Sequence, residues 1–121
     1  MNVKNVLLFM VVVCFSFGAE KPTVEECKQI MGAGVYNQIL EDTCHFSGEV
    51  SKSFIKMFTI GGCREIMGSE LINSVAGDVI SDTLPRYKKF GKEVFCKENW
   101  KGYDELMEDE AVKKFDLGNI K

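Results

Sequence analysis

The sequence is poor in the residues from which most catalytic and metal sites are built. Its 121 residues include one histidine and one tryptophan, and the five cysteines form no C-x-x-C pair. It has neither a P-loop for phosphate nor the G-x-S-x-G turn that presents a nucleophilic serine. We therefore expect no catalytic residues, no bound metal and no cofactor, and we expect that the protein is not an enzyme.

An excess of positive charge is also missing. The chain has 15 Lys and Arg residues against 18 Asp and Glu residues, a net charge of -3. This charge gives no basic footprint for nucleic acid. The hydrophobic share of 45% and the small net charge argue against disorder, and the length is that of one domain.

No hydrophobic run is long enough to cross a membrane, which takes about 20 apolar residues. The longest run covers residues 6–17 and follows a short segment with a single lysine, Lys4. This arrangement is typical of a cleaved signal peptide, and an uncleaved anchor is the less favoured alternative. Ser16 and Gly18 suit a cut after Gly18. We expect a signal peptide over 1–18, one mature domain over 19–121, and export to a bacterial periplasm or the extracellular space.

Removal of residues 1–18 leaves an even number of cysteines. These are Cys27, Cys44, Cys63 and Cys96, and the mature net charge becomes -4 because one lysine is lost. Four cysteines in an exported chain favour two disulfides. Their wide spacing is unlike that of zinc sites, whose ligands come in close pairs.

Helix geometry reduces the number of possible cysteine pairings. In one straight helix, Cys27 and Cys44 would be about 25 Å apart, too far to be bridged. This leaves Cys27–Cys63 with Cys44–Cys96, or Cys27–Cys96 with Cys44–Cys63. We favour the first pairing, because a second helix that returns antiparallel brings Cys63 back to Cys27. A strict up-and-down bundle would argue against it, and a break at the glycines near residue 33 would readmit Cys27–Cys44.

The apolar pattern is helical throughout, with intervals of three and four residues and no sustained alternation. Thr23 and Glu26 form a predicted capping box at the start of a first helix, which we expect to end near Asp42. A second helical segment is expected to open at residues 47–48 and to break at 60–62, followed by a short helical turn around 63–67. A third helix, capped by Ser69, is expected to end at Leu84, and further helices are expected from 85 onward and over 103–115. The predicted fold class is all-α, a compact bundle of four to five short helices held by two disulfides.

Pro85 marks a predicted boundary between two helices. Proline disfavours the helical conformation of the residue before it and is well suited to the first turn of a helix. We therefore predict that one helix ends at Leu84 and that the next begins at Pro85. In that next helix, Tyr87, Phe90 and Val94 fall on one stripe, which we expect to point inward.

Two groups of side chains are candidates for a function. His45 could take part in acid–base chemistry with a nearby carboxylate, although a histidine in a loop between helices is the favoured interpretation. The only basic cluster consists of Arg86, Lys88, Lys89 and Lys92. It could contact an anionic partner surface or a phospholipid headgroup, or simply be a solvated helix face.

These observations favour an exported, non-enzymatic domain that binds another protein. An inhibitor, a toxin-immunity protein or an accessory factor of the cell envelope would fit. The alternative is a carrier of a small hydrophobic ligand between the helices, suggested by the aromatic content. We expect no nucleic-acid partner and no transmembrane segment in the mature chain.

Overall fold

The computed structural model describes residues 21–114, and the predicted signal peptide lies outside them. The described residues form helices without any strand, which confirms the all-α class. The helices are α2 (Val24–Cys44), α3 (Val50–Ile60), α4 (Cys63–Met67), α5 (Ser69–Met107) and α6 (Glu110–Lys114).

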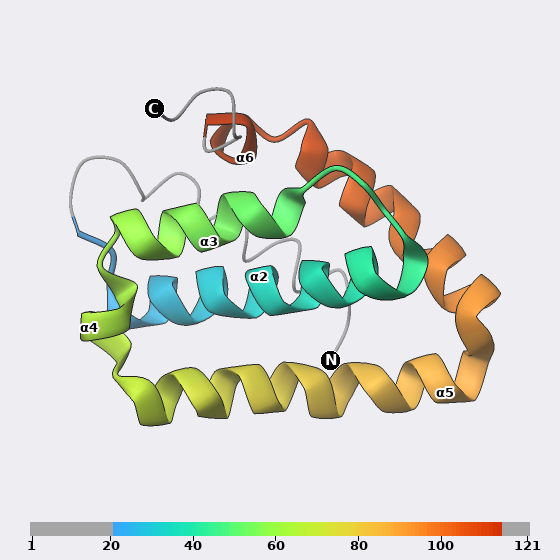
Figure 1. The fold of residues 1–121 in the computed structure, drawn as a ribbon, viewed down its shortest axis with the longest axis horizontal. Coiled ribbons are helices and arrows are strands. Elements are labelled where there is room, and N and C mark those ends of the chain that lie inside the picture. The colour runs from blue at the N-terminus through green and yellow to red at the C-terminus, as the bar shows by residue number, and fades with distance from the viewer. Residues whose placement is uncertain (1–20, 115–121) are drawn as a thin grey trace.

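Helix α2 is the centre of the molecule. Figure 1 shows α3 on one side of it, running in the opposite direction, and the first part of α5 on its other side, running in the same direction. The α3 and α5 helices both pack on α2 but have little contact with each other. Two helices therefore flank one central helix on opposite sides.

The predicted start of α2 is confirmed in detail. The Thr23 backbone N–H donates to the Glu26 carboxylate at 2.8 Å, and the Glu26 N–H donates to the Thr23 hydroxyl at 3.1 Å. These two bonds satisfy backbone donors that a helix start otherwise leaves free. The helix ends at Cys44, two residues beyond the expected end, where His45 adopts a left-handed conformation with φ of 60°.

The predicted helix boundary at Pro85 is wrong. Helix α5 continues through Pro85, and its one non-helical residue is Gly91, with φ of 84° and ψ of 161°. Proline removes a backbone donor from a helix. The Arg86 side chain makes a separate contact in the same turn, where its Nε donates to the Asp82 carbonyl at 3.2 Å. Gly91, which tolerates a positive φ, makes the bend instead.

This displaced bend changes which side chains are buried. Phe90 and Val94 are 48% and 43% exposed, so the prediction that they point inward is wrong. Tyr87 is partly buried and meets the ring of Phe95 edge to face at 5.5 Å, and Phe95 itself is buried in the core. The last predicted helix also differs, since residues up to Met107 belong to α5 and a separate α6 follows.

The favoured disulfide pairing is confirmed. Cys27 is bridged to Cys63 and Cys44 to Cys96, with Cα–Cα distances of 5.5 and 5.6 Å. The bend at Gly91 removes the objection raised by a strict up-and-down bundle. Beyond the bend, α5 turns back toward the end of α2 (Figure 1), and Cys96 thereby reaches Cys44.

Candidate functional site

An apolar groove is lined by side chains of α2, α3 and α5. Its volume is about 380 Å³. Within residues 21–114 it is open on one side, and all but one of its lining side chains are apolar or glycine. The lining residues are Ile30, Met31, Gly34, Val35, Gln38, Ile39, Phe54, Ile55, Phe58 and Ile80.

The floor of the groove is a second apolar stripe of α2. Met31, Val35 and Ile39 follow one another at intervals of four residues, so they share one face of the helix. A different face of α2 carries the fully buried Ile30 and Leu40. Helix α2 thus presents more apolar surface than its two neighbours cover, and the uncovered part is the floor.

The walls come from helices on either side. Phe54 anchors the α3 wall in the core, whereas Ile55 on the same helix is 53% exposed at the rim. Ile80 of α5 lies on the opposite wall and is also exposed. Gly34 sets the approach of α3, because a Cβ built at this glycine would lie 3.4 Å from the Phe54 Cβ.

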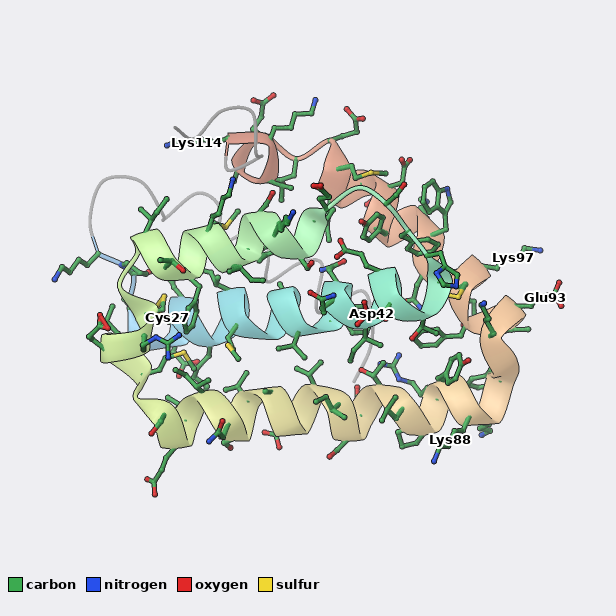
Figure 2. The ribbon with its side chains drawn as sticks, in the orientation of Figure 1. Cys27, Asp42, Lys88, Glu93, Lys97 and Lys114 are labelled. Atoms are coloured by element: carbon green, nitrogen blue, oxygen red, sulfur yellow. A yellow bond between two sulfur atoms is a disulfide. The ribbon has the colours of Figure 1, made fainter. Side chains whose placement is uncertain are left out.

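Gln38 is the single polar side chain in the lining. Its Nε2 donates to the Asp42 carboxylate at 3.1 Å, and its Oε1 accepts from the Ser51 hydroxyl at 3.3 Å. Asp42, labelled in Figure 2, lies one turn further along α2. The groove therefore has an apolar length and one polar end.

A second polar cluster adjoins this end and holds the loop before α3. The Glu41 carboxylate accepts from the Tyr103 hydroxyl at 2.8 Å and from both the backbone N–H and the hydroxyl of Ser51. The Tyr103 hydroxyl also accepts from the Gly48 N–H at 2.9 Å. Burial, followed by the hydrogen bond and the negative charge of Glu41, raises the pKa of Tyr103 above its ordinary value.

Tyr36 forms the corresponding buried contact between α2 and the second part of α5. Its hydroxyl donates to the Asn99 side-chain oxygen, and Asn99 Nδ2 donates to the Phe95 carbonyl at 2.7 Å. Burial raises the pKa of Tyr36 as well, although the nearby positive charge of Arg86 opposes the rise. These contacts fix the second part of α5 on α2.

His45 is not assembled into an acid–base site by the described residues. It is exposed at the end of α2, and no hydrogen bond or ion pair joins it to another side chain within residues 21–114. The two carboxylates near it in sequence, Glu41 and Asp42, bind other groups. Nor does the described part of the chain gather three or more potential metal ligands.

The predicted basic cluster is divided by the fold. Arg86 is half-buried and pairs with Asp82, with 3.2 Å between its Nη2 and the carboxylate oxygen. Lys88, Lys89 and Lys92 are exposed beside the Gly91 bend, and no described carboxylate forms an ion pair with them. Figure 2 shows Lys88 directed away from the body of the molecule.

The sequence suggested a pocket between the helices as an alternative, but it did not indicate which residues would line it. The apolar positions of α2 form a wide face, since Met31, Val35 and Ile39 lie on a different side from Ile30 and Leu40. The sequence pattern does not say how much of such a face neighbouring helices cover.

No family model matches the chain, and neither a curated protein nor a solved structure matches it. A function can thus be argued only from its own residues.

Proposed function

We propose that this protein binds a small hydrophobic ligand in the groove between α2, α3 and α5. The observation that carries this function is the apolar lining around a volume of about 380 Å³. Pockets for small molecules range from about 300 to 1,000 Å³ and combine mostly apolar walls with a few polar groups. Gln38 would supply the polar group here, at the end of the groove.

Covalent cross-links support a groove that exists before a ligand arrives. Both disulfides start on α2, which forms the floor. One leads to Cys63, directly after the α3 wall, whereas the other leads to Cys96, beyond the bend from the Ile80 wall. The first bridge therefore holds the α3 wall on the floor, and a wall that is fixed before binding loses less conformational entropy, which favours affinity.

The disulfides also support a place of action outside a reducing cytosol. No helix in residues 21–114 has the length and apolar character needed to span a membrane. Both observations are compatible with the export expected from residues 1–18. An exported carrier or sensor of an apolar small molecule is the function that these features favour together.

The test is a titration with N-phenyl-1-naphthylamine, a neutral probe that fluoresces in apolar surroundings. We expect saturable binding of one probe per protein. Ile55→Gln places a polar side chain on the groove rim and is expected to weaken binding about tenfold, from the loss of apolar contact. Ile55 and Ile60, the residue changed in the control variant, both lie on α3 and are more than half exposed. Neither substitution should therefore unfold the protein.

The matched control is Ile60→Gln. Ile60 is 59% exposed on the same helix but does not line the groove. We expect unchanged probe affinity for this variant. Equal weakening by the two substitutions, or a probe signal that does not saturate, would contradict binding in the groove.

A protein partner is the second candidate, favoured by apolar side chains outside the groove. Val24 and Ile60 are exposed where α2 begins and α3 ends. A stable protein interface buries about 800 Å² per partner and would have to extend beyond the groove. A protein partner that binds there should displace the probe, and both the Ile55→Gln and the Ile60→Gln variant should bind it more weakly. A small ligand should bind more weakly to the Ile55→Gln variant alone.

A further inference from the structure

We propose that the bend of α5 docks on a membrane surface of anionic phospholipid. The docking surface, called the basic apex below, combines five lysines with three exposed apolar side chains. Its lysines are Lys88, Lys89, Lys92, Lys97 and Lys101, and its apolar residues are Phe90, Val94 and Trp100. This inference is independent of what the groove binds.

The charge of the basic apex is opposite to that of the rest of the chain. Residues 88–101 hold five lysines against Glu93 and Glu98, a net charge of +3. Because the whole chain carries -3, all other residues together carry -6. No carboxylate within residues 21–114 forms an ion pair with any of the five lysines, so their charge is available to a partner.

The apolar residues of the apex point to a lipid surface. Phe90 is next to the bend, and the Lys89 ammonium lies 5.4 Å from the centre of its ring. Val94, Lys97 and Trp100 follow at intervals of three residues and share one side of the second part of α5. Lysines among exposed Phe, Val and Trp match segments that lie in the interface of a bilayer.

The shape and composition disfavour an acidic protein as the occupant. The apex surrounds a bend at the end of the molecule, where Figure 2 shows Lys88 and Lys97 directed outward on either side of the bend. Protein interfaces are depleted in lysine and enriched in arginine, whereas lysines near an anionic bilayer each add to the attraction. The one arginine nearby, Arg86, is paired with Asp82.

Trp100 provides an intrinsic probe for the test. It is the only tryptophan of the chain and lies within the apex, 45% exposed. The oxidised protein is mixed with vesicles of phosphatidylcholine alone, or with one third phosphatidylglycerol. We expect cosedimentation and a blue shift of Trp100 emission with anionic vesicles only, and release in about 0.5 M salt, where charges are screened.

Charge-reversal variants distinguish binding through the basic apex from an effect of the protein's overall charge. Lys88→Glu with Lys89→Glu should lower vesicle affinity about 30-fold or more, since each lysine near the surface contributes roughly a fivefold factor. The control, Lys28→Glu with Lys52→Glu, makes the same change of charge on α2 and α3 and should alter affinity less than threefold. Phe90→Ser should weaken binding several-fold while the fold, checked by circular dichroism, is retained.

Several outcomes would overturn the inference. These are equal binding to neutral and anionic vesicles, an unshifted Trp100 emission, equal losses in the two charge-reversal variants, and capture of an acidic protein without any binding to vesicles. Failure of the groove probe leaves these measurements unaffected, and their failure leaves the groove unaffected.

Discussion

The two disulfides lie in contrasting surroundings. Cys27–Cys63 joins the start of α2 to α4, and both of its cysteines are fully buried in the core. Cys44–Cys96 joins the end of α2 to α5 just beyond the bend, where both cysteines are only partly buried. One bridge is thus part of the packed core, whereas the other holds a bend whose apolar side chains remain exposed. The same kind of cross-link can therefore be part of the packed core in one place and hold two segments together near the surface in another.

The largest expected effect comes from removing the buried bridge. Chain entropy assigns about 4 kcal/mol to each disulfide and slightly more to Cys44–Cys96, whose cysteines are 52 rather than 36 residues apart. Replacing Cys27 and Cys63 by alanine also leaves a cavity in the core, which adds a cost that the half-exposed pair does not have.

We therefore expect the Cys27→Ala, Cys63→Ala protein to lose about 1 kcal/mol more stability than the Cys44→Ala, Cys96→Ala protein. Guanidinium denaturation of both variants measures the difference. If the Cys44→Ala, Cys96→Ala protein is the less stable of the two, loop length outweighs burial. The contrast between the buried bridge and the partly buried bridge is then incorrect.

The next effect concerns the two glycines of α5 that have open space around them. A Cβ added at Gly91 or Gly77 would meet no atom within 4 Å. Gly91 has a φ of 84° and a ψ of 161°, a region that other residues avoid, so Gly91→Ala should cost about 1–3 kcal/mol. Gly77 is in the helix, and Gly77→Ala should stabilise by about 0.5–1 kcal/mol. Thermal unfolding tests the opposite signs, and two changes of equal sign would argue against a bend set by Gly91.

The smallest effect is a dependence on alkaline pH. In the unfolded chain Tyr103 ionises near its ordinary pKa of about 10, whereas its pKa is raised in the folded protein. Above pH 10 the unfolded state releases a proton that the folded state keeps. The free energy of unfolding should therefore fall as pH rises, by at most about 1.4 kcal/mol per pH unit for this group.

In the Tyr103→Phe protein, the free energy of unfolding should fall less steeply with rising pH, because the contribution of Tyr103 is absent. The contribution of Tyr36, whose pKa is also raised, should remain. The Tyr87→Phe protein is the control, since Tyr87 has no hydrogen bond to another described side chain. Urea denaturation at several values between about pH 9 and pH 11 measures the slopes. An unchanged slope in Tyr103→Phe would show that the buried hydroxyl is not responsible.

Local signals predicted the helix starts, whereas contacts between distant segments decided the bend. The capping box at Thr23 and the break at Gly61 need only their sequence neighbours, and both were predicted. The bend lies at Gly91 rather than at Pro85, and the bridge from Cys96 to Cys44 holds the second part of α5 beyond it. A contact between segments so far apart in the sequence cannot be read from a helical period.

For the candidate sites, too, the sequence predicted local features but not those that depend on distant segments. The basic cluster and the apolar stripes of α2 were visible in the sequence, but exposure was not. Val35 and Ile39 line a groove that α3 and α5 leave open, and Phe90 is exposed next to the bend at Gly91. Exposure depends on the distances between helices, which no local pattern contains.

The two bridges also overlap along the chain, because Cys44 lies within the first closed loop and Cys63 within the second. Any single backbone cut between Cys27 and Cys96 therefore leaves the fragments joined by at least one covalent bond. Lys88, Lys89 and Lys92 are exposed at the bend and lie between Cys27 and Cys96, so a trypsin-like protease that cuts after one of them makes such a cut. A molecule nicked there would still migrate as one species until it is reduced, so an exported protein of this design could be cleaved by a protease without being separated.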